Sequence, residues 1–194
     1  MKSKIHKLYR AVSLLSQIPI LTAILILLLL KFGKLDYQDL HWIVITLINL
    51  SFFPLIYGFS LYLNHNVSDE NIMIRKERIM PFFVVTAIYG INFILAITLG
   101  APKILQIIAV NYFLLSIILS IITIFWKISA HVAGMTIFIA LSAILINYQA
   151  LFFSPLIFLV AWVRIKIESH NFWQVVSGGI LAIIIIYLTI NMNL

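Results

Sequence analysis

No cysteine occurs in this 194-residue sequence, which excludes disulfides, thiolate metal sites and cysteine nucleophiles. Charge is scarce as well, at 10% of the residues. The six acidic residues are scattered along the chain as Asp36, Asp39, Asp69, Glu70, Glu77 and Glu168. Because an oxygen-ligand site for Mg²⁺ or Ca²⁺ needs several carboxylates that converge, we expect chemistry without a bound metal ion and predict no cofactor.

Apolar residues, by contrast, make up 63% of the chain, which leaves too little polar surface to coat a soluble globule. A membrane-spanning helix takes roughly 20 apolar residues, and such runs fill nearly the whole sequence. We predict spans at residues 11–30, 40–63, 81–99, 104–126, 130–147, 149–165 and 173–190. The predicted fold is therefore an all-α, polytopic membrane helix bundle of six or seven transmembrane helices, with one integral membrane domain over residues 1–194.

Two local features predict how the last spans pack. Only residues 147–149 separate the fifth run from the sixth, which indicates a tight helical hairpin. The last span contains Ser177, Gly178 and Gly179, and small residues of this kind let a neighbouring helix backbone approach closely.

Three polar stretches interrupt the apolar runs, at residues 64–80, 126–131 and 164–171. Two predicted spans separate the first stretch from the second, and two more separate the second from the third. Since two crossings return the chain to the face from which it started, all three stretches can meet at one membrane face.

Lys and Arg are distributed unevenly between the two predicted faces. The face of the polar stretches and the N-terminus has ten: Lys2, Lys4, Lys7, Arg10, Arg75, Lys76, Arg78, Lys127, Arg164 and Lys166. The opposite face has three: Lys31, Lys34 and Lys103. By the positive-inside rule, the face with the polar stretches is predicted to be cytoplasmic.

The polar stretches contain many basic and imidazole side chains but few carboxylates. The candidate site residues are Arg75, Lys76, Arg78, Lys127, Ser129, His131, Arg164 and His170. Ionisable groups in membrane helices are read by default as functional. Such a set can hold a dianion on its positive charges and move protons through its histidines, which suits phosphoryl transfer.

The spacing of these residues resembles the three motifs of the type 2 phosphatidic acid phosphatase superfamily. Those motifs are, in words, Lys with a later Arg-Pro, then Pro-Ser-Gly-His, then Ser-Arg with His after five further residues. Here residues 75–81 read RKERIMP, residues 128–131 read ISAH, and five residues separate Arg164 from His170. The resemblance covers about residues 68–182. It implies a metal-independent lipid phosphatase that hydrolyses a lipid phosphomonoester or diphosphate.

The resemblance also implies roles for the two histidines. His170 would be the nucleophile that forms a phosphohistidine, and His131 the acid that protonates the leaving group. Histidine suits both tasks because its ordinary pKa of about 6.5 keeps either protonation state accessible near neutrality.

A second implied set of residues would hold the phosphate. Its members are Arg164, Arg78, Arg75, Lys76, Ser129 and Lys127. Which of Arg75 and Lys76 takes the place of the motif's Lys stays open. Ser129 precedes a predicted helix, whose unpaired amides and dipole favour an anion.

The sequence departs from the family pattern at several places. Two residues separate Arg78 from Pro81, and Ala130 replaces the Gly of the second motif. Gln174 stands four residues after His170, where many members have Asp. On a helix this spacing puts the Gln174 oxygen near the imidazole, where it can accept from Nδ1–H and leave Nε2 for attack. The branch that resembles dolichyl and undecaprenyl diphosphate phosphatases also carries Gln there, which favours a polyprenyl diphosphate as substrate.

Other interpretations of the same residues stay open. Cations at helix ends also anchor loops to headgroups, and Gln in a membrane helix also bonds to a neighbouring helix. A carrier or channel for an anion would place the cations at mid-membrane depth, and an inactive family member or a scaffold would have no turnover. A prenyltransferase would need paired Asp-rich motifs.

The net charge of +7 lies at span ends, so we predict membrane lipids and a lipid-linked phosphate as partners and no nucleic acid.

Overall fold

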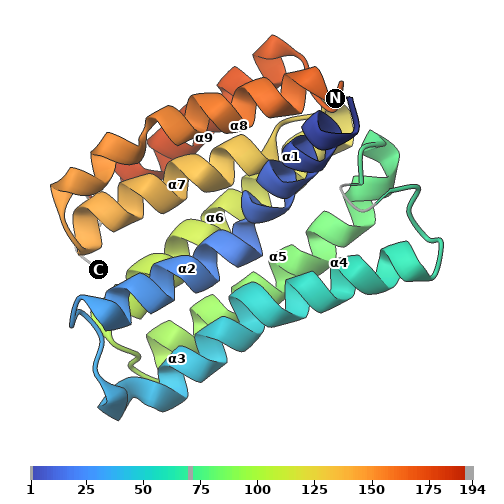
Figure 1. Ribbon diagram of the computed structural model, residues 1–194. Coiled ribbons are helices and arrows are strands. Elements are labelled where there is room, and N and C mark those ends of the chain that lie inside the picture. Colours follow the sequence, from blue (N-terminus) through green and yellow to red (C-terminus); the bar gives the residue numbers. More distant parts are fainter. Residues whose placement is uncertain (1, 70–71, 191–194) are drawn as a thin grey trace.

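The computed structural model describes residues 2–69 and 72–190, with side chains from residue 7 onward. Every regular element in this part of the chain is helical (Figure 1). The α-helices are α1 (Lys2–Leu15), α2 (Ile18–Lys31), α3 (Leu40–Leu47), α4 (Phe53–Leu63), α5 (Arg75–Thr98), α6 (Lys103–Phe125), α7 (Ala130–Leu145), α8 (Pro155–Lys166) and α9 (Phe172–Ile190). The predicted all-α class is confirmed. Glu70 and the side chains of Lys2 and Lys4 lie outside the described residues.

Three short elements extend these helices. The 3₁₀ turns η1 (Tyr37–Asp39) and η3 (Tyr148–Phe153) precede α3 and α8, and the π-helical turn η2 (Ile48–Phe52) joins α3 to α4. As a result, α3 and α4 form one continuous helical segment, and η3 lengthens the short α8.

Five helical segments are long and apolar enough to cross a membrane: Tyr37–Leu63, Arg75–Thr98, Lys103–Phe125, Tyr148–Lys166 and Phe172–Ile190. The run predicted at residues 11–30 falls instead on two helices, Lys7–Leu15 and Ile18–Lys31, which are bent by 62° at their junction. The run predicted at residues 130–147 forms α7 over only 16 residues. Because counting the bent pair as one crossing gives at most six spans by length, the number seven stays a prediction.

The bend between α1 and α2 follows from the residues at the junction. Gln17 is extended, with φ −68° and ψ 136°, and Pro19 lies in the first turn of α2, where a missing N–H breaks no helical bond. A Cβ on Gly134 would lie 2.5 Å from Cγ1 of Ile18, so this glycine lets α2 begin close against α7. The junction is thereby held beside the first turns of α7.

The π-helical turn η2 has its cause in Pro54. Proline has no N–H, so it cannot donate to the carbonyl of Leu50 four residues earlier. The hydroxyl of Tyr89 donates to that carbonyl instead, at 3.2 Å. This bond ties the α3–α4 segment to the middle of α5.

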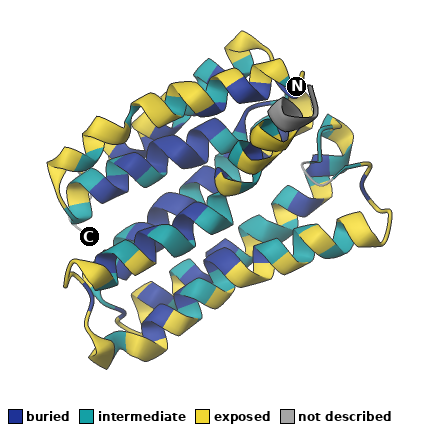
Figure 2. Ribbon diagram, viewed as in Figure 1, coloured by how far each residue is buried: buried dark blue, intermediate teal, exposed yellow. Residues whose placement is uncertain are grey.

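The centre of the bundle consists of α6 and α7, whereas α4 and α8 expose their outer surfaces (Figure 2). On α5, Phe93 stacks against Phe113 of α6 with ring centroids 5.2 Å apart. Gly178 of α9 packs on the start of α7, where an added Cβ would lie 2.5 Å from the carbonyl oxygen of Ser129. The predicted close approach is confirmed for Gly178, while a Cβ on Gly179 would make only ordinary contacts at 3.8 Å.

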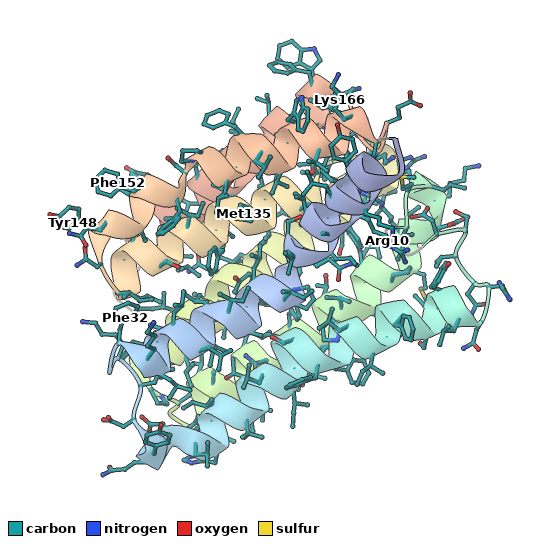
Figure 3. The ribbon with its side chains drawn as sticks, viewed as in Figure 1. Arg10, Phe32, Met135, Tyr148, Phe152 and Lys166 are labelled. Carbon is teal, nitrogen blue, oxygen red and sulfur yellow. The ribbon has the colours of Figure 1, made fainter. Side chains whose placement is uncertain are left out.

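The two ends of the bundle differ in composition. The α4–α5, α6–α7 and α8–α9 connections lie at one end, together with the N-terminus (Figure 1). Phe32, Tyr148 and Phe152 mark the opposite end, whereas Arg10 and Lys166 lie toward the first one (Figure 3). The meeting of the three polar stretches at one end, predicted from the number of intervening helices, is confirmed.

Candidate active site

His170 is the residue around which the candidate site is built. It lies between α8 and α9 and is only 5% exposed. Its Nδ1 is 3.1 Å from Oε1 of Gln174, and its Nε2 is 3.4 Å from Nη1 of Arg78. The position predicted for the Gln174 oxygen, beside the imidazole, is the one that the structure has. The two ring nitrogens therefore face different partners, an amide acceptor and a guanidinium.

The end of α8 and the start of α9 fix the backbone around His170. The amides of Ser169 and His170 both donate to the carbonyl of Arg164, at 3.1 Å, and close the last turn of α8. Asn171 then caps α9, because its Oδ1 accepts from the amide of Gln174 at 3.0 Å while Gln174 Oε1 accepts from the amide of Asn171 at 3.2 Å. This reciprocal pair holds the Gln174 oxygen where it meets Nδ1 of His170.

Arg164 lies entirely inside the bundle, with no exposed surface. Its Nη1 donates to the hydroxyl of Ser13, and its Nη2 donates to the hydroxyl of Ser169. Neither serine belongs to the residues proposed from the sequence. No sequence pattern points to Ser13, which lies 151 positions from Arg164, whereas Ser169 could have been noticed as the neighbour of His170.

His131 occupies the first turn of α7. A hydrogen bond joins its ring to the backbone of Ser13, while Nε2 is out of contact with solvent and has no hydrogen-bond partner. Arg164, Arg78 and His170 all lie close enough for their charges to act on this ring. His131 is therefore held by the α1–α2 junction, near Arg78 and Arg164.

Ser129 is the N-cap of α7, as predicted. Its hydroxyl accepts from the amide of Val132 at 3.4 Å, and its own amide donates to the carbonyl of Gln174 at 3.1 Å. The second bond ties the start of α7 to the first turn of α9. It fixes the helix that carries His131 relative to the loop that carries His170.

The three basic residues of the first motif have different surroundings. Arg78 is 3% exposed, and its Nε donates to the carbonyl of Ile72 while its Nη1 faces His170. Arg75 instead donates to the carbonyls of Thr123, at 3.0 Å, and Ile124 at the last turn of α6. Lys76 is exposed. The structure thus brings Arg78 to His170 and engages Arg75 with the end of α6.

The site carries a strong excess of positive charge. Burial, together with the charges of Arg78, Arg164 and Lys127, lowers the pKa of His170 to about 2. Burial and the two arginines lower the pKa of Lys127 to about 8. The negative charge of Asp69, in the α4–α5 connection, acts in the opposite direction on the pKa of Lys127. A bound dianion would relieve this repulsion.

Taken together, these groups can bind a phosphoryl group beside a neutral imidazole whose Nδ1 already has an acceptor. Within the described ranges, no three His, Asp or Glu side chains lie close enough together to hold a metal ion. Comparison of the chain with protein-family models, with curated proteins and with solved structures found no match. The functional argument therefore depends on the geometry of the site and on the residues that form it.

Proposed function

We propose that this protein is a membrane lipid phosphatase that hydrolyses a lipid phosphomonoester or a polyprenyl diphosphate through a phosphohistidine on His170. The proposal rests on one arrangement: Nε2 of His170 faces Nη1 of Arg78 at 3.4 Å while Nδ1 faces the Gln174 oxygen at 3.1 Å. This arrangement supports a nucleophile that is held in one tautomer beside a binding site for phosphate oxygens.

The protonation state of His170 suits nucleophilic attack. Its lowered pKa, about 2, keeps the imidazole neutral throughout the physiological pH range. With Nδ1–H donating to Gln174, Nε2 carries the lone pair, which faces Nη1 of Arg78 and would turn to phosphorus once a phosphoryl group binds the guanidinium. Arg78, Arg164 and Lys127 would neutralise the charge of the phosphoryl oxygens during transfer.

Hydrolysis would take two steps. In the first step the bond from His170 Nε2 to phosphorus forms and the bond from phosphorus to the leaving oxygen breaks. His131, which takes up a proton once the bound dianion offsets the positive charge of the site, gives that proton to the leaving oxygen. The leaving group is a lipid alcohol for a monoester and a lipid monophosphate for a diphosphate. In the second step water attacks phosphorus and gives a proton to His131, the nitrogen–phosphorus bond breaks, and inorganic phosphate leaves.

The membrane setting belongs to the same proposal. With the bent α1–α2 pair as one crossing and α7 as another, the five long segments complete a bundle of seven spans. The catalytic residues then lie at helix ends, at the depth of lipid headgroups, which favours a lipid phosphatase over a carrier with charges at mid-membrane depth. We place this face in the cytoplasm, in accordance with the excess of Lys and Arg on it.

The proposal is tested by phosphate release from purified protein in detergent, with a polyprenyl diphosphate and a phosphatidate as substrates and EDTA present. We expect turnover in EDTA and its complete loss in His170→Ala. His41→Ala, in the exposed start of α3, is the matched control and should retain full activity. Full activity in His170→Ala would refute the nucleophile, and loss of wild-type activity on chelation would refute the metal-free mechanism.

A further inference from the structure

An apolar cleft of about 180 Å³ begins at the candidate active site and runs into the bundle. On α5 it follows Pro81, Phe82, Val85 and Tyr89, and on α6 the residues Tyr112, Leu115, Ser116, Leu119 and Ser120. From Pro81 to Tyr89, and from Tyr112 to Ser120, the cleft follows a helix over a rise of eight residues, which is about 12 Å. His131 lines the end of the cleft that is nearest to the cationic group, and Tyr89 and Tyr112 lie at the far end, with ring centroids 6.4 Å apart.

Prolines from three helices border this cleft. Pro19, Pro54 and Pro81 all line it, one each from α2, α4 and α5. Pro81 lies inside α5, where its ring clashes with the carbonyl of the residue four positions earlier, whereas Pro19 and Pro54 lie in the first turns of α2 and α4. Gly58 of α4 also lines the cleft, and an added Cβ there would meet no atom within 4 Å. Residues from three helices therefore border the same cleft as His131.

We propose that this cleft binds the first part of the hydrocarbon chain of the substrate, and that it accepts one chain, as in a polyprenyl phosphate or diphosphate, in preference to a two-chain lipid. The inference rests on the proposed function, because it needs the phosphate beside His170 and the leaving oxygen beside His131. A chain attached to that oxygen would continue into the cleft that His131 lines.

The size of the cleft supports a single chain. Its volume is well below the roughly 300–1,000 Å³ of pockets that bury a whole small molecule. Its length of about 12 Å is less than half of the roughly 30 Å hydrocarbon thickness of a bilayer. The cleft therefore takes a chain segment next to the phosphate, and the remainder of the chain stays in the lipid.

Gly58 provides the test, because it lines the cleft and a Cβ added there would meet no atom within 4 Å. Gly58→Phe, with Gly58→Leu as a milder variant, would be compared with Ile56→Phe, which adds bulk at a site on the same helix that is 68% exposed. The substrates would be farnesyl diphosphate, dioleoyl phosphatidate and water-soluble butyl phosphate, in detergent micelles at fixed surface concentration. Binding of radiolabelled farnesyl diphosphate would be measured in parallel.

We expect Gly58→Phe to lower kcat/KM for farnesyl diphosphate at least tenfold and to change kcat/KM for butyl phosphate less than twofold. Ile56→Phe should match the wild type for both substrates. The wild type should also prefer farnesyl diphosphate to dioleoyl phosphatidate at least tenfold.

Two results would overturn the cleft proposal while leaving the phosphatase intact: equal kcat/KM of Gly58→Phe and wild type for farnesyl diphosphate, or a wild-type preference for phosphatidate. If the wild type hydrolysed no substrate, the proposed function would fail. The binding measurement would then decide about the cleft: weaker farnesyl diphosphate binding in Gly58→Phe alone would support it, and equal binding in all variants would overturn it.

Discussion

The amide oxygen of Gln174 lies 3.1 Å from Nδ1 of His170, one helical turn away on the same segment of chain. The same oxygen also accepts from the amide of Asn171, so a helix cap and an imidazole share one acceptor. This sharing makes the orientation of His170 depend on how α9 begins. Gln174, which accepts a hydrogen bond at the start of α9, thus also selects the nitrogen of His170 that remains available for attack.

We expect Gln174→Ala to lower kcat about 10- to 100-fold, because the loss of an orienting acceptor frees the imidazole to rotate and change tautomer. Gln174→Glu should retain activity, since it keeps an oxygen in place. Asn171→Ala is the control: it removes the other half of the cap, at a cost of about 1 kcal/mol of stability, and leaves the His170 contact. Phosphate release and thermal unfolding in detergent measure both effects. A larger loss of kcat in Asn171→Ala than in Gln174→Ala would contradict this role.

The pH dependence of phosphate binding should show whether the ammonium group of Lys127 contributes to the site. Burial and the neighbouring charges of Arg78 and Arg164 lower the pKa of its ammonium group to about 8, so the positive charge is lost as the pH rises through 8. Affinity for inorganic phosphate should then fall by up to tenfold per pH unit above pH 8. Lys127→Arg should bind phosphate without this decline, because guanidinium stays protonated. Product inhibition between pH 6.5 and 9.5 is the measurement, and identical profiles for the two proteins would exclude Lys127 from the site.

Substitutions should show that Arg75 has a structural role and that Arg78 binds phosphate. Arg75→Ala removes a partly exposed cap on the last carbonyls of α6, and we expect a loss of about 1 kcal/mol of stability with KM unchanged. Arg78→Ala should lower kcat/KM at least 100-fold, since it removes a buried charge beside Nε2 of His170. Lys76→Ala, on the exposed side, should change neither quantity. An increase of KM in Arg75→Ala larger than that in Arg78→Ala would reverse the assignment.

Ser13 should act on the reaction through Arg164 and His131. Its hydroxyl accepts from Arg164 and its backbone bonds to the ring of His131. We expect Ser13→Ala to lower kcat/KM about tenfold, because Nη1 of the buried Arg164 loses its hydrogen bond to the Ser13 hydroxyl. Ser16→Ala is the control, since the Ser16 hydroxyl donates to the carbonyl of Ser13 at the same bend. If activity and unfolding temperature decreased equally in both variants, the effect of Ser13→Ala would be a general destabilisation of the bend.

The sequence alone predicted the helical class and the end of the bundle at which the site lies. Both follow from quantities that need no tertiary contact: the share of apolar residues, and the even number of helices between the polar stretches at residues 64–80, 126–131 and 164–171. The place of the Gln174 oxygen was predicted as well, from a helical spacing of four residues. His170 itself precedes α9, so the contact is made by a Gln174 side chain that reaches back across the start of this helix.

The tertiary structure decided what depends on distant segments and on helix direction. The sequence shows that Arg75 and Arg78 are three residues apart, but only the packing of α5 against α6 engages one with Thr123 and directs the other to His170. Ser13 reaches Arg164 because a bend of 62° interrupts the predicted first span and Gly134 lets α2 approach α7. Composition fixes which segments are apolar enough to cross a membrane, since that depends on each segment by itself. The partners of a buried charge depend on how several bent helices pack together, and that is a property of the whole fold.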